Sequence, residues 1–193
     1  MSAEPPIAFG PGIATCTFAV ERNPVRRSPR DLRRRLNALS DRHGGARAIT
    51  QRTREVPQAY RTHYGVERSP AEELTIKRLI RGQYRSRGVL RDALLIATMD
   101  TEVAVYALDA DRVTGIPRLA GEEIVDDDGP LVPLFVEPGA KTGRWPNRRL
   151  IGRDVAATRA TRHITLYAVT APGIADITVE EAVYTAYDIS ASA

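Results

Sequence analysis

An apolar block at residues 90–108 limits the folds open to this chain more than any other segment. Its first part, residues 90–99, carries only two charged side chains, Arg91 and Asp92, and predicts a buried helix. Residues 102–108 are rich in valine and alanine and predict a buried strand directly after that helix. The 193-residue chain is long enough to close one sizeable core around such a unit.

Helix-start patterns mark two further helices in the first half. Ser28 and Pro29 are followed by leucines at helical spacing, which predicts a helix to residue 43 with Ser28 as its cap. Ser69 and Glu72 repeat the arrangement before a helix that ends at Gly82. Residues 57–65 predict a short helix between them.

Extended segments account for most of the remaining chain. Alternation predicts strands at residues 14–20 and 163–169, shorter extended pieces over 115–125, and a strand at 131–136. Thr178 and Glu181 predict the cap of a final helix. Strands and helices do not alternate regularly, so we expect one α+β domain over residues 13–193, with a mixed, largely antiparallel sheet packed with helices. Residues 1–12, rich in proline and glycine, predict a loose leader.

Charge differs between the two halves of the chain. Residues 1–99 carry 19 Lys and Arg against 9 Asp and Glu, whereas residues 100–193 carry 9 against 15. A basic face in the first half could meet phosphates. Arginine, however, accounts for 26 of the 28 basic residues, which a GC-rich coding sequence also produces without selection for a ligand. Both interpretations stay open.

Composition narrows the class of protein. No stretch approaches the roughly 20 apolar residues of a membrane span, and the start lacks a signal-peptide pattern, so we expect a cytoplasmic protein. The single cysteine, Cys16, and three scattered histidines offer no zinc spacing. We therefore expect neither a structural metal nor a cofactor.

One block of motifs points to a known family. It consists of Asp92 in the apolar helix, the run 107–115 (Ala-Leu-Asp-Ala-Asp-Arg-Val-Thr-Gly), and Gly121-Glu122 before a strand. In order and spacing these resemble the B3/B4 domain of the phenylalanyl-tRNA synthetase β-subunit. The resemblance covers residues 55–170 and implies a B3/B4-like fold. Asp109 and Asp111 within the run are interpreted as carboxylates that stabilise a turn.

The resemblance also implies an activity. In the synthetase this domain is an editing module that hydrolyses wrongly charged tRNA, so the chain is expected to be a free-standing protein directed at aminoacyl-tRNA. Tyr106 occupies the position of the family's editing histidine, and His163 stands where the family has an asparagine. Both are candidate catalytic residues, although a tyrosine in the core or a surface histidine is the simpler interpretation of each. Glu122 belongs to the expected binding residues.

A loop at residues 137–153 holds the other binding candidates. Guanidinium groups bind phosphates in a forked geometry, and an exposed indole stacks on a base. Such a set of side chains would suit the terminal adenosine of a tRNA. Alternatively, the tryptophan anchors the loop to the core and the arginines are solvated. The candidates are Arg144, Trp145, Asn147, Arg148 and Arg149.

Two classes of function follow from these observations. The first is a tRNA-binding protein that hydrolyses the aminoacyl ester or diverts the aminoacyl group to an amine, as a deacylase or a transferase. The second is an enzyme or binding protein for an amino-acid-like small molecule that reuses the fold without tRNA. A purely structural, partner-binding role is a third possibility.

Overall fold

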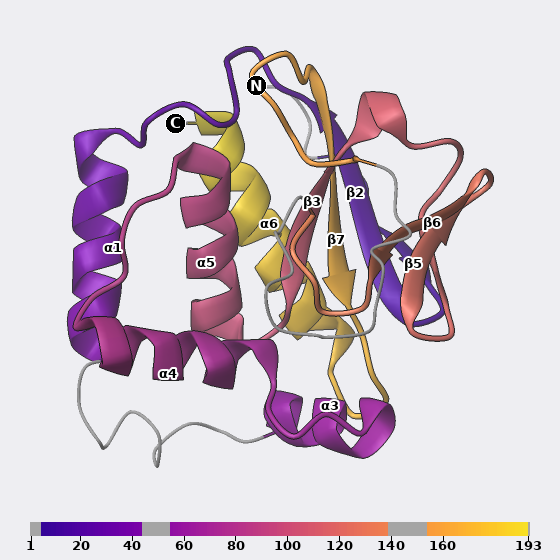
Figure 1. Cartoon of the computed structure of the whole chain (residues 1–193), viewed down its shortest axis with the longest axis horizontal. Helices are drawn as coiled ribbons and strands as arrows, with labels where there is room; N and C mark the ends of the chain where they lie inside the picture. Colours follow the sequence, from indigo (N-terminus) through magenta and orange to yellow (C-terminus); the bar gives the residue numbers. More distant parts are fainter. Residues whose placement is uncertain (1–4, 44–54, 139–153, 193) are drawn as a thin grey trace.

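The computed structural model describes residues 5–43, 55–138 and 154–192, and within them the chain forms an α+β fold with two antiparallel sheets (Figure 1). The larger sheet has the strand order β1-β2-β7-β3. Its strands are β1 Ala8–Gly10, β2 Ile13–Ala19, β7 His163–Val169 and β3 Val105–Asp109. The smaller sheet has the order β4-β5-β6, with β4 Arg118–Ala120, β5 Glu123–Asp126 and β6 Gly129–Pro133. The expected α+β class is confirmed.

Five helices lie within the described residues. They are α1 Arg30–Arg42, α3 Glu55–Tyr64, α4 Pro70–Arg81, α5 Val89–Thr101 and α6 Asp176–Ser192, with a short 3₁₀ turn at Ala110–Arg112. Of these, α5 and α6 pack against the larger sheet, whereas α1 and α4 pack against α5. In Figure 1, α1, α5 and α6 stand side by side next to the sheet and α4 crosses below them. Phe18 on β2 meets Tyr187 on α6 edge to face, with ring centroids 4.9 Å apart. The β2 side chains on the same face of the strand as Phe18, two and four residues before it, therefore point toward the helices.

The predicted buried helix, α5, lies between two apolar clusters. On one side Leu90, Leu94 and Ala97 join the main core with β3, β7 and α6. On the other side Ile96 and Met99 pack with Leu36 and Leu39 of α1. A helix buried on both sides needs an apolar surface all round, and this explains why its sequence carries so few charged residues.

Three local predictions about helix ends can be compared with the structure. Ser69 and Glu72 form the expected capping box, with the Ser69 hydroxyl accepting from the Glu72 N–H, and Gly82 ends α4 in the left-handed conformation. Ser28 does not cap α1: Pro29 holds the cap position, and the Ser28 hydroxyl donates to the Asp92 carboxylate at 2.6 Å instead. A buried charged acceptor forms a stronger hydrogen bond than a backbone amide does, so the tertiary partner prevails.

The other corrections concern element boundaries. Residues 8–10, inside the expected leader, form β1 and pair with β2 through a turn at Gly12, whose φ is 77°. The final helix begins at Asp176, two residues before the predicted cap Thr178. β6 spans Gly129–Pro133 rather than 131–136. Among the described helices, none has the length and apolar character to cross a membrane.

Candidate functional site

A pair of tyrosines lies on the sheet face opposite the Phe18 side. Tyr106 on β3 and Tyr167 on β7 are direct partners in the antiparallel register. Their rings stack with centroids 5.3 Å apart and an interplanar angle of 26°. Because successive side chains of a strand point to opposite faces, Tyr106 and Tyr167 lie together on the face that points away from α5 and α6.

The Tyr167 hydroxyl is buried and finds no hydrogen-bond partner among the described residues. Tyr167 is 1% exposed, and no donor or acceptor in residues 5–43, 55–138 and 154–192 reaches its oxygen. Burial raises the pKa of this phenol above its ordinary value, so it stays protonated and can donate at neutral pH. A native structure rarely leaves such a group unpaired, because the desolvation of a hydroxyl costs about 1–3 kcal/mol.

Tyr106 is partly exposed. Burial is the main cause that raises its pKa, and the neighbouring tyrosines Tyr167 and Tyr60 and the carboxylates of Glu137 and Glu73 raise it further. The phenol is therefore a proton donor throughout the neutral range. Glu137 also contacts the N-terminal end of α5, because its Oε1 lies 2.8 Å from Nε of Arg91.

The aromatic cluster below the pair has a structural role. Tyr60 is fully buried; its hydroxyl donates to the Val169 carbonyl at 2.8 Å and accepts from the Ala104 N–H at 3.0 Å. Tyr64, one helical turn later, bonds the Thr170 carbonyl. The Phe135 ring meets both tyrosines edge to face, at 5.2 and 5.3 Å. These contacts fasten α3 to the ends of β3 and β7 and fix the floor of the site.

The two candidate catalytic residues do not share a site. His163 begins β7, four residues before Tyr167, and a strand rises about 3.3 Å per residue, so about 13 Å separate them along the strand. Nδ1 of His163 lies 2.8 Å from Oδ1 of Asp111, and both side chains are about half exposed. The bond to His163 lowers the pKa of Asp111. His163 and Tyr106 therefore cannot act together on one carbonyl.

The aspartates of the family-like run stabilise turns, as interpreted from the sequence. Asp109 is 4% exposed and accepts from the Thr161 hydroxyl at 2.7 Å and the Asp111 N–H at 3.3 Å. The N–H of Thr114, however, bonds Asp126, which is 1% exposed and also accepts from the Asp128 N–H. The acidic turn after β5 therefore has a structural role, since the buried Asp126 carboxylate joins two backbone segments.

The remaining binding candidates lie apart from the tyrosine pair or outside the described residues. Glu122 is an exposed residue of the β4–β5 turn, and its carbonyl accepts from the Leu134 N–H at 2.8 Å. Arg144, Trp145, Asn147, Arg148 and Arg149 fall within 139–153 and so lie outside the described residues. In the three described ranges no group of His, Cys, Asp and Glu is arranged to hold a metal ion.

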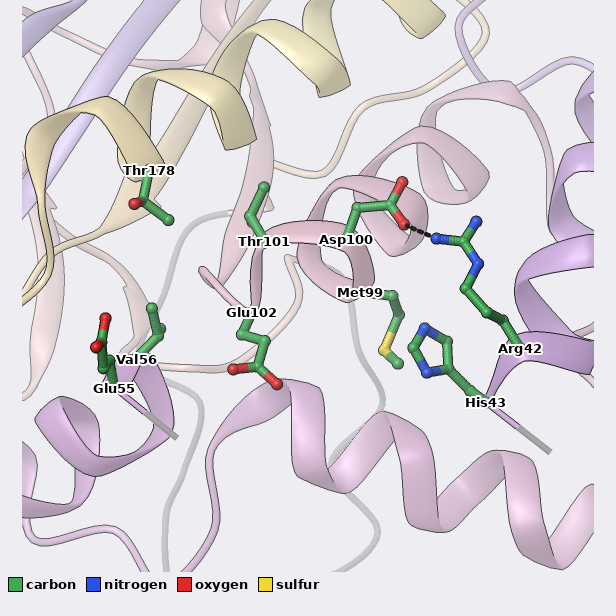
Figure 2. A pocket seen from close by; sticks show the side chains of 9 residues that line it. All are labelled: Arg42, His43, Glu55, Val56, Met99, Asp100, Thr101, Glu102 and Thr178. Atoms are coloured by element: carbon green, nitrogen blue, oxygen red, sulfur yellow. Dashed lines mark hydrogen bonds and ion pairs between the residues drawn. The ribbon is translucent and has the colours of Figure 1, made fainter. Parts of the chain in front are cut away.

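A separate cavity of about 300 Å³ lies at the C-terminal ends of α1 and α5 (Figure 2). Asp100 on its wall is already engaged: Oδ1 lies 3.3 Å from Arg42 and Oδ2 lies 3.3 Å from Arg35. Thr178 and Val56 close the other end. None of the paired tyrosines lines this cavity, so the unsatisfied hydroxyl and the cavity are different features.

Sequence reasoning missed two members of the site. Tyr167 was recognised only as part of a strand and Glu137 only as the start of a loop. A tyrosine in the middle of an otherwise apolar strand is the pattern that marks Tyr167, since its hydroxyl must find a partner when buried. No protein-family model matches this chain, and comparison with curated proteins finds no match.

Proposed function

We propose that the protein acts on aminoacyl-tRNA, and that Tyr106 and Tyr167 receive the aminoacyl ester at the 3′ end. The observation that carries the proposal is the buried Tyr167 hydroxyl, which has no hydrogen-bond partner in the described part of the chain, on a ring that stacks against the partly exposed Tyr106. An acceptor oxygen placed at this pair supplies the missing bond. The resemblance to an editing domain, in which Tyr106 stands at the position of the editing histidine, supports an ester as the source of that oxygen.

Chemistry at the pair follows from the protonation of the two phenols. Raised pKa values keep both hydroxyls as donors, which suits the negative charge that develops on a carbonyl oxygen during ester cleavage. Water adds to the carbonyl carbon, the bond to the ribose oxygen breaks, and that oxygen takes the proton. An amine in place of water gives the transferase variant.

Deacylation of a mixed pool of labelled aminoacyl-tRNAs tests the proposal. We expect selective loss of label with the wild type, and at least a tenfold lower rate with Tyr106→Phe and Tyr167→Phe, because each loses one oxyanion donor. Tyr187→Phe is the matched control, since it removes a phenol from the opposite side of the sheet. Unchanged rates in both site variants contradict the proposal.

Free amino acids give the second arm of the experiment. The tyrosine pair suits an amino-acid-like small molecule as well as its ester. Binding of a free aromatic amino acid, together with neither deacylation nor salt-dependent retention of tRNA, would select the small-molecule function. Retention of uncharged and charged tRNA with equal affinity would remove the aminoacyl group from the proposal.

A further inference from the structure

Two loops that are distant in sequence lie against each other at the N-terminal end of α5. Residues 20–29 connect β2 to α1, and residues 82–88 connect α4 to α5. The Val89 N–H donates to the Arg26 carbonyl at 3.0 Å and the Leu90 N–H to the Pro24 carbonyl at 3.1 Å. In Figure 1 the two loops meet where α1 and α5 begin.

The buried carboxylate of Asp92 joins these loops. Asp92 is 1% exposed and accepts from the Ser28 hydroxyl at 2.6 Å, the Ser86 hydroxyl at 2.5 Å and the Arg87 N–H at 2.8 Å. Gly88 suits this close approach: its φ is 108°, and a Cβ there would lie 3.0 Å from the Arg26 carbonyl oxygen, a tighter contact than nearly all Cβ atoms make. The two loops are therefore held in one rigid arrangement.

Seven arginines lie in the joined loops or in the first turns of the helices that follow them. We call this set the arginine surface; it consists of Arg22, Arg26, Arg27, Arg30, Arg85, Arg87 and Arg91. Within the described residues, Arg87 and Arg91 share the single carboxylate of Glu137. Arg22, Arg27, Arg30 and Arg85 form no ion pair or hydrogen bond there. The nearby Asp31 pairs with Arg34, which lies outside the set.

Such a concentration of like charge is costly unless an anion accompanies it. Guanidinium groups match phosphate oxygens in forked pairs, and a surface held rigid before binding loses little entropy on binding. None of the exposed large hydrophobic side chains lies in the two loops, so an apolar anchor for a lipid surface is missing there. A nucleic-acid backbone fits these properties better than a membrane.

Glu137 lies beside the arginine surface. Its carboxylate contacts Arg91 and Arg87, and its charge is one of the smaller causes that raise the pKa of Tyr106. We propose that the arginine surface binds the phosphate backbone of tRNA and leads its 3′ end toward Tyr106. This inference rests on the proposed function for the identity of the RNA, whereas the binding of the phosphate backbone stands on the arginines and the Asp92 contacts.

Salt-dependent retention of uncharged tRNA on filters provides the test. Arg27→Gln with Arg85→Gln removes two exposed charges, and Arg68→Gln with Arg118→Gln is the control with the same change in net charge, at ion pairs remote from the loops. We expect the surface variant to bind roughly tenfold more weakly in low salt and to reduce the slope of log affinity against log salt by about 1.4–1.8. The control should keep the wild-type slope.

Charge-conserving variants and a second readout complete the design. Arg27→Lys with Arg85→Lys should restore the slope, because each ammonium still displaces a counter-ion. An unchanged slope in the glutamine variant, or an equal loss in the control, overturns the inference, as does binding only to phosphatidylserine vesicles and not to RNA. If the wild type retains tRNA with the expected slope but does not deacylate it, the proposed function fails and the inference stands. If the wild type deacylates aminoacyl-tRNA but the salt slope of tRNA binding is the same in the Arg27 and Arg85 variant, only the inference about the arginine surface fails.

Discussion

Two buried tyrosines should respond in opposite directions to the same substitution. Tyr60 and Tyr167 are 0% and 1% exposed, and both belong to the main core. The Tyr60 hydroxyl bonds the Val169 carbonyl and the Ala104 N–H, whereas the Tyr167 hydroxyl bonds no group of the described residues. Replacing each with phenylalanine removes one oxygen and leaves the ring contacts in place.

The expected magnitudes follow from the hydrogen bonds. Tyr60→Phe leaves a buried N–H and a buried carbonyl unsatisfied, at about 1–3 kcal/mol each, so we expect a loss of about 3 kcal/mol and a fall in Tm of about 6–12 °C. Tyr167→Phe removes a hydroxyl that is desolvated without compensation, so we expect a gain of about 1 kcal/mol and a rise in Tm of about 2–4 °C. The same variant should lose activity toward aminoacyl-tRNA.

Urea unfolding, with both variants compared at an unchanged m-value, provides the assay. Tyr187→Phe serves as the reference for the loss of a half-buried phenol and should shift the free energy of unfolding by less than about 0.5 kcal/mol. Destabilisation by Tyr167→Phe as large as that by Tyr60→Phe would mean that the Tyr167 hydroxyl has a partner in the folded protein. The argument for a ligand at this pair would then be refuted.

Three further substitutions or treatments probe other parts of the structure. Asp92→Ala should destabilise the protein by about 3 kcal/mol in urea unfolding, because the buried Ser28 hydroxyl and the partly buried donors of Ser86 and Arg87 lose their shared acceptor. Burial alone would raise the pKa of Glu72, but hydrogen bonds from the Ser69 N–H and the Arg61 guanidinium hold this pKa below its usual 4.5. The wild type should therefore be more stable than Glu72→Gln above pH 4.5, and this advantage should disappear as the pH falls through the lowered pKa. Thermal unfolding of both proteins from about pH 7 to about pH 3 measures the difference. Burial raises the pKa of Cys16 to about 11, so iodoacetamide at pH 8 should label it, by mass spectrometry, only after unfolding.

Each of these has an outcome that contradicts it. A stable Asp92→Ala variant with intact RNA binding would show that the two loops hold their positions without the carboxylate. A difference between wild type and Glu72→Gln that grows as the pH falls has the wrong sign for a lowered pKa. Rapid labelling of native Cys16 would mean that β2 opens easily at residue 16.

The comparison of Ser69 with Ser28 shows where sequence patterns suffice. The capping box at Ser69 involves atoms within four residues of each other, so the pattern contains all of the interaction. Ser28 precedes a proline and a helix in the same way, but its hydroxyl bonds Asp92, 64 residues away. A local pattern cannot report a distant acceptor, and for this reason the Ser28 prediction was wrong.

The site was predictable to a smaller extent. Tyr106 was a candidate from its place in the family-like motif, and the structure gives it Tyr167 as a partner through strand register. His163 shares the strand with Tyr167 but lies at its other end, beside Asp111. Whether any of these residues binds a substrate stays a prediction.

Local periodicity and capping carried the α+β class and the approximate positions of its helices and strands, because those properties depend on side chains a few residues apart. The unpaired Tyr167 hydroxyl, the distance between Tyr106 and His163 and the joining of the arginine loops through Asp92 follow only from the packed chain. Each depends on strand register or on burial between segments distant in sequence. Such contacts form only when the hydrophobic core closes, since the core determines which polar groups lose water together and must pair.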